Sequence, residues 1–92
     1  MPIESLPIVM NNIFEDPFLN KETKIDRMLI YLNQNRECFE RPEAIGALNV
    51  LNKKIVALVD SQTPPSLITK INLLSSQLLT CAASGKSQYN IS

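Results

Sequence analysis

The sequence predicts an all-α protein, a single domain over residues 1–92 that is built as an antiparallel up-down four-helix bundle. Three observations lead to this prediction. Apolar residues recur at spacings of three and four along most of the chain, as they do on one face of an amphipathic helix. No segment alternates apolar and polar residues over enough length to form a strand. Prolines separate the periodic segments, and the short connections between them favour antiparallel neighbours.

Four helices are expected, and each start has a local cause. Ser5 is a good cap residue, Asn20 is another, Pro42 suits a first helical turn, and Pro64-Pro65 is the clearest break in the chain. The expected helices cover about residues 5–15, 21–36, 42–61 and 65–84, and a polar tail covers 85–92. Their apolar stripes are Ile8, Val9, Ile13 and Phe14; then Ile25, Met28, Leu29 and Leu32; then Ala44, Leu48, Leu51, Ile55, Leu58 and Val59; and finally Leu67, Ile71, Leu74, Leu78 and Cys81, with Leu73 and Leu79 widening the last.

The two glycines have different expected roles. Gly85 follows the last periodic residues and predicts the C-terminal end of the fourth helix. Gly46 lies inside the third helix, where it costs up to about 1 kcal/mol relative to alanine. A glycine there would allow the close approach of another helix.

The net charge of zero excludes a global basic field that would attract nucleic acid. Residues 1–46 hold eight acidic and five basic side chains, whereas residues 47–92 hold four basic side chains and one acidic. Two interpretations of these opposite balances stay open. The two halves face each other in the folded protein, or the basic half faces an anionic partner.

Catalysis and cofactor binding have little support in the sequence. The chain contains no histidine, so neither Cys38 nor Cys81 has an imidazole base to activate it, and a zinc site is not expected. The only glycines, Gly46 and Gly85, form no phosphate-binding loop. No signal-peptide pattern is evident at the N-terminus. We therefore expect a non-enzymatic cytoplasmic protein with no cofactor, no metal and two free thiols, a disulfide between them being the alternative.

The fourth helix is the most informative segment, because Lys70 is its only charged residue between Ser66 and Ser84. Either this helix is the most enclosed of the bundle, or its outer face contacts a partner. Lys70, Asn72 and Gln77 argue against a membrane-spanning segment.

Several runs of residues resemble the small immunity proteins of the enterocin A type, which protect bacteria from their own pediocin-like bacteriocins. The runs are Asn11–Pro17, Ile25–Leu32 and Leu48–Asn52, followed by the proline-led last helix and the polar end Lys86–Tyr89. The resemblance covers nearly the whole chain as a pattern of helices. It implies a four-helix bundle that acts by binding.

The resemblance also implies a partner and a place for it. Members of this family recognise the bacteriocin together with its membrane receptor, a sugar-transporting mannose permease, from the cytoplasmic side, peripherally at the inner face of the membrane. The C-terminal part carries the discrimination between bacteriocins. The expected partner-binding residues are therefore Gln77, Thr80, Ser84, Lys86, Gln88 and Tyr89. The alternative function is a small helical chaperone or adaptor that binds an amphipathic helix of another protein; the oligomeric state stays open.

Overall fold

The computed structural model describes the backbone of residues 6–90 and the side chains of residues 8–87. This part of the chain is helical and contains no strand, which confirms the predicted all-α class. Its elements are α1 (Leu6–Glu15), α2 (Lys21–Gln34), α3 (Arg36–Phe39), the 3-10 turn η2 (Pro42–Ala44), α4 (Ile45–Val56) and α5 (Pro65–Asn90).

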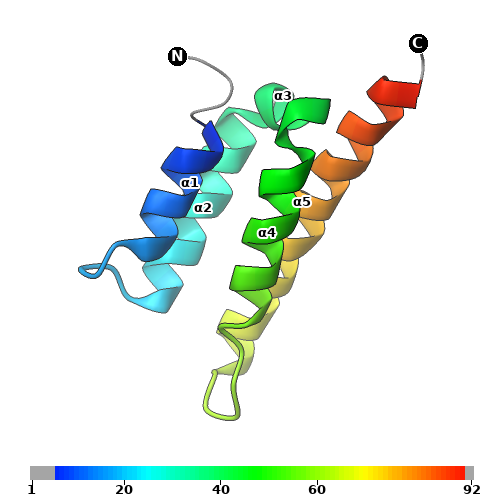
Figure 1. Ribbon diagram of the computed structural model, residues 1–92. Helices are drawn as coiled ribbons and strands as arrows, with labels where there is room; N and C mark the ends of the chain where they lie inside the picture. Colours follow the sequence, from blue (N-terminus) through cyan, green and yellow to red (C-terminus); the bar gives the residue numbers. More distant parts are fainter. Residues whose placement is uncertain (1–5, 91–92) are drawn as a thin grey trace.

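The long helices form two hairpins (Figure 1). Helices α1 and α2 lie side by side and are joined by the loop 16–20, and α4 and α5 lie side by side and are joined by the loop 57–64. The short elements α3 and η2 connect the hairpins at the end of the molecule where α1 begins. Helix α5 contacts α4 most extensively and also packs against α2, α3 and η2, whereas α1 packs against α2, α3 and α4.

The core is aliphatic, as expected, and the predicted stripes of the last three helices supply most of it. Buried side chains come from every element; they are Met10, Ile25, Met28, Leu32, Phe39, Ala44, Leu48, Leu51, Ile55, Leu67, Ile71, Leu74, Leu78, Cys81 and Ala82. Helix α1 differs from the prediction, because Met10 is its buried residue and Ile8 is exposed. Val59 is exposed as well, since it lies in the loop after α4.

The start of α2 confirms the predicted cap. The Asn20 side-chain oxygen accepts a hydrogen bond from the Thr23 backbone N–H at 2.8 Å, which satisfies one of the free donors of the first turn. Glu22 lies in that turn, where its charge is favourable to the helix dipole. The predicted start of the first helix near Ser5 lies outside the described residues.

The segment between α2 and α4 is more broken than the sequence predicts. Helix α2 ends at Gln34 because Asn35 folds back, with its side-chain nitrogen donating to the Tyr31 carbonyl oxygen at 2.9 Å. The four-residue α3 then carries Phe39 into the core, where its ring meets the Tyr31 ring edge to face at 6.1 Å between centroids. Pro42 begins the 3-10 turn η2, and the α-helix proper begins only at Ile45.

The predicted extent of the third helix to residue 61 is wrong, because α4 ends at Val56. Asp60 and Thr63 build a local turn that competes with the helix. The Asp60 carboxylate accepts from the Gln62 N–H at 2.8 Å and from the Thr63 hydroxyl at 3.0 Å, while the Thr63 hydroxyl oxygen accepts from the Asp60 N–H at 2.9 Å. The Lys21 ammonium lies 3.6 Å from the Asp60 carboxylate and thereby ties the loop to α2.

Replacing Asp60 by asparagine is expected to destabilise the protein near neutral pH and to have no effect in strong acid. The hydrogen bonds from Gln62 and Thr63, and then the charge of Lys21, hold the pKa of the Asp60 carboxyl below its ordinary value of 3.8. A lowered folded-state pKa adds stability above the unfolded-state pKa, and this stability is lost as pH falls through the folded-state pKa.

Urea unfolding at several pH values checks this expectation. The difference between the wild type and Asp60→Asn should be constant from neutral pH down to about pH 5 and should shrink to nothing below the lowered pKa of Asp60. Thr63→Val removes the hydrogen bond that the Thr63 hydroxyl donates to the Asp60 carboxylate. It should therefore reduce the part of the free energy of unfolding that depends on pH. A difference that does not change with pH would contradict the assignment.

The sequence predicts a helix end at Gly85, and the structure corrects this prediction. Helix α5 continues to Asn90, so the expected polar tail is helical over residues 85–90. Gly85 is buried, and a Cβ atom built on it would lie 2.8 Å from the backbone carbon and oxygen of Arg41 and 3.2 Å from the Pro42 nitrogen. The glycine therefore lets the backbone before η2 pack directly on α5.

Ion pairs join the two oppositely charged halves of the sequence. Besides the contact between Lys21 and Asp60, Lys54 lies 3.8 Å from Glu15, and Lys70 contacts two carboxylates of α2. These contacts support the interpretation that the halves face each other. The side chains of all these ion pairs are at least partly exposed. Each pair therefore contributes at most about 1 kcal/mol to the free energy of unfolding.

Candidate partner-binding surface

One side of α5 faces solvent from Ser66 to Ser87. We name this side the outer face of α5 and define it by the exposed residues Ser66, Thr69, Asn72, Leu73, Ser76, Leu79, Thr80, Ala83, Lys86 and Ser87. These residues recur at helical spacings, opposite the buried stripe from Leu67 to Cys81. The fourth helix therefore keeps one exposed side, although it also packs against α4, η2, α2 and α3, so both interpretations of its low charge stay open.

Two leucines make the outer face partly apolar. Leu73 is 49% exposed and Leu79 is 48% exposed. The sequence pattern predicted that both would widen the buried stripe, because they are apolar and adjacent to it. Each lies more than a quarter turn from the centre of the buried stripe, and that angle is the signal that could have placed them on the surface.

The single charge of this segment is directed away from the outer face. The Lys70 ammonium lies 2.9 Å from a Glu22 carboxylate oxygen and 3.1 Å from an Asp26 carboxylate oxygen, both on α2. The hydrogen bonds to Glu22 and Asp26 raise the pKa of Lys70 above its ordinary value. The outer face therefore carries no charge from Ser66 to Ala83, and Lys86 is the first cation along it.

Only some of the predicted partner-binding residues are exposed on the outer face of α5. Thr80 and Lys86 are exposed on the outer face, although the Thr80 hydroxyl donates to the Ser76 carbonyl oxygen at 2.8 Å. Ser84 is half-buried at its edge, and Gln77 is half-buried with a side-chain oxygen that has no hydrogen-bond partner.

For the last two predicted residues, Gln88 and Tyr89, the structure describes only the backbone. Both continue α5 and extend its axis beyond Lys86. Their side chains lie outside the described residues.

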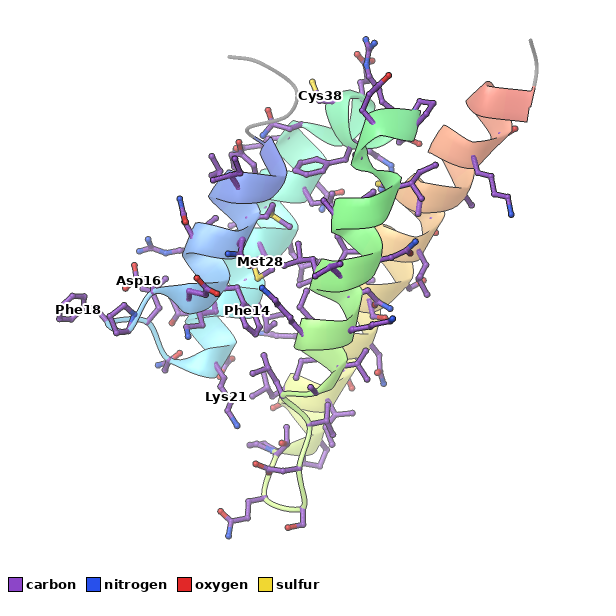
Figure 2. All side chains as sticks on the ribbon, in the orientation of Figure 1. Phe14, Asp16, Phe18, Lys21, Met28 and Cys38 are labelled. Atoms are coloured by element: carbon purple, nitrogen blue, oxygen red, sulfur yellow. The ribbon has the colours of Figure 1, made fainter. Side chains whose placement is uncertain are left out.

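A further exposed apolar residue lies outside the helices and was not predicted from the sequence. Phe18, in the loop between α1 and α2, is 92% exposed and points away from the body of the molecule, whereas Met28 points into the core (Figure 2). The loop itself is ordered by the Asp16 carboxylate, which accepts a hydrogen bond from the Phe18 N–H at 2.9 Å. Periodicity assigns no role to a residue outside a helix, so no pattern pointed to it.

The cysteines and carboxylates form no catalytic or metal-binding constellation in the described part of the chain. Cys38 on α3 is half-buried, Cys81 on α5 is buried, and both thiols are free. Burial raises the pKa of the Cys81 thiol, which disfavours the nucleophilic thiolate. No group of three or more Cys, Asp or Glu side chains is placed to hold a metal ion in this region.

Comparison of the chain with protein-family models, with curated proteins and with solved structures found no match in any of the three. Membership of the enterocin A immunity family therefore stays a prediction from the sequence pattern. Among the described residues, no helix is both long enough and apolar enough to cross a membrane.

Proposed function

We propose that this chain is a bacteriocin immunity protein, which acts by binding and not by catalysis. It protects the producing cell by recognising the bacteriocin–receptor complex from the cytoplasmic side, peripherally at the inner face of the membrane. The up-down four-helix bundle implied by the family resemblance belongs to this proposal, and the two antiparallel hairpins support it. The observation that carries it is the outer face of α5, which holds no charge from Ser66 to Ala83.

The cost of desolvation favours a binding surface without unpaired charges. A protein interface removes water from both surfaces, and an unpaired charge in its centre costs several kcal/mol. The outer face of α5 avoids this cost between Ser66 and Ala83, because the one charge of that segment, on Lys70, is already paired with carboxylates of α2. Covering the exposed halves of Leu73 and Leu79 adds roughly 1 kcal/mol each. Lys86, which has no ion pair among the described residues, is available for an anionic group at the rim.

Expression of the chain in a bacteriocin-sensitive strain tests the proposal. The cells are challenged with a panel of pediocin-like peptides, and the wild-type chain is expected to protect against at least one of them. Leu79→Glu should abolish this protection, because it places a carboxylate on the outer face at one of its two exposed leucines. Ile30→Glu is the matched control, since Ile30 is a similarly exposed apolar residue on α2.

Two outcomes would contradict the proposal. Unchanged killing across the panel, in cells that accumulate the folded wild-type protein, would exclude immunity against this class of peptide. Full protection by Leu79→Glu would exclude the outer face as the binding surface. Circular dichroism of both purified variants verifies that the substitutions leave the helices intact.

A further inference from the structure

One side of α4 faces solvent, opposite the buried residues of that helix. Its exposed residues recur at helical spacings; they are Gly46, Asn49, Val50, Lys53 and Val56. Glu43 is exposed as well and lies in η2, one turn before Gly46. These positions follow one another at spacings of three and four, so they share one side of the helix. We name Glu43, Gly46, Val50 and Lys53 the outer stripe.

The middle of the outer stripe is apolar and has an open recess at Gly46. Val50 is 55% exposed, and both residues line an apolar groove of about 360 Å³ between α4 and α1. No atom lies within 4 Å of a Cβ built on Gly46, and no described glycine has a positive φ. Neither packing within the chain nor backbone conformation therefore requires a glycine here. Its effect is that another helix can approach α4 closely at this point.

The two ends of the outer stripe carry opposite charges. Glu43 at one end and Lys53 at the other are exposed, and neither takes part in an ion pair among the described residues. Lys54, next to the groove, is instead held by α1, because it donates to the Asn11 side-chain oxygen at 2.8 Å and lies 3.8 Å from Glu15. An occupant that satisfies both ends must bring a cation to Glu43 and an anion to Lys53.

A second copy of this chain supplies both charges at the required positions. When a helix packs antiparallel on its own copy about a two-fold axis, residues equally far on either side of the axis meet. Gly46 and Val50 each lie two residues from Leu48, and Glu43 and Lys53 each lie five residues from it. One axis at the level of Leu48 therefore matches the valine with the recess and the glutamate with the lysine in the same register.

We propose that the outer stripe is the interface of a two-fold homodimer. Val50 of each copy packs over Gly46 of the other, and Glu43 of each copy pairs with Lys53 of the other. A foreign helix would have to bring the same groups in the same order, whereas a second copy already holds them. Both ion pairs lie at the rim, so they fix the register more than they add affinity.

The dimer is expected to be weak and reversible. One helix from each copy makes a small interface, in the class that buries less than about 1,200 Å². A dissociation constant between about 1 μM and 1 mM suits an interface of this size with one apolar contact at its centre. The monomer therefore predominates in dilute solution, and the dimer forms as the concentration rises.

Sedimentation velocity of the full-length protein over a series of concentrations tests the proposal. Glu43→Lys and Lys53→Glu should each weaken self-association by roughly tenfold or more, because each brings two pairs of like charges together. An equimolar mixture of the two variants should associate as the wild type does, since every pair then joins a lysine to a glutamate. The double variant Glu43→Lys/Lys53→Glu should recover for the same reason, and damage to the fold cannot produce either recovery.

Further variants locate the interface. Gly46→Leu and Val50→Glu should each weaken self-association by roughly tenfold or more, because one fills the recess and the other charges it. Ile30→Glu on α2 and Leu79→Glu on α5 are the matched controls, since both replace similarly exposed apolar residues, and both should dimerise as the wild type does. Circular dichroism establishes that each variant is folded.

Three results would overturn the proposal. The first is a monomer at every concentration up to about 1 mM. The second is a dimer that Val50→Glu leaves unchanged, and the third is a mixture of the two charge variants that associates no better than either alone. The inference does not rest on the proposed function, because Leu79→Glu should abolish protection and yet leave the dimer intact.

Discussion

Replacing Phe39 by alanine is expected to lower the free energy of unfolding by about 3–5 kcal/mol, the largest effect of any single substitution considered for this chain. Phe39 is fully buried, and its ring also makes the edge-to-face contact with Tyr31. Helix α3 has only four residues and cannot be stable alone, so the buried Phe39 side chain anchors it to the core. This loss is a large part of the total free energy of unfolding, which is about 5–15 kcal/mol for a native protein.

Urea unfolding followed by far-UV circular dichroism measures the effect. Ile30→Ala is the control, because Ile30 is exposed on α2 and its loss should change the free energy of unfolding by no more than about 0.5 kcal/mol. Native-state hydrogen exchange should show lost protection around α3 and η2 in the Phe39→Ala protein. A loss of stability below about 1 kcal/mol would mean that Phe39 is not the anchor of this segment.

Alanine substitutions at the two glycines are expected to change the free energy of unfolding in opposite directions. Gly85→Ala gains up to about 1 kcal/mol of helix propensity but places a methyl group 2.8 Å from the Arg41 backbone, which is below any real Cβ contact. Overpacking of this kind costs about 1–3 kcal/mol, and backbone atoms cannot yield as a flexible side chain can. We expect a net loss of stability at Gly85 and a gain of up to about 1 kcal/mol at Gly46.

Thermal and urea unfolding of the two variants, measured side by side, check this prediction. Gly85→Val provides a graded series, since its larger side chain should destabilise more than alanine does. If Gly85→Ala stabilised the protein as much as Gly46→Ala, the close approach between α5 and the segment before η2 would be refuted.

The amino-acid sequence by itself determined the helical class, the approximate positions of α2, α4 and α5 but not the ends of α4 and α5, and most residues of their buried stripes. The reason is that helical periodicity and caps are local. The side chain of Asn20 reaches only the first turn of its own helix, and the spacing of Ile71, Leu74 and Leu78 requires one buried side whatever packs on it. The low charge of the last helix was equally visible.

Only the tertiary structure decided what happens where distant segments meet. Gly85 looked like a helix end, but the Arg41 backbone fills the space beside it, and the helix continues. Lys70 looked like the one charge of an outer face, but Glu22 and Asp26 hold it against α2. The sequence places neighbours along one helix, whereas close contacts and ion pairs depend on which helices lie side by side and at what distance.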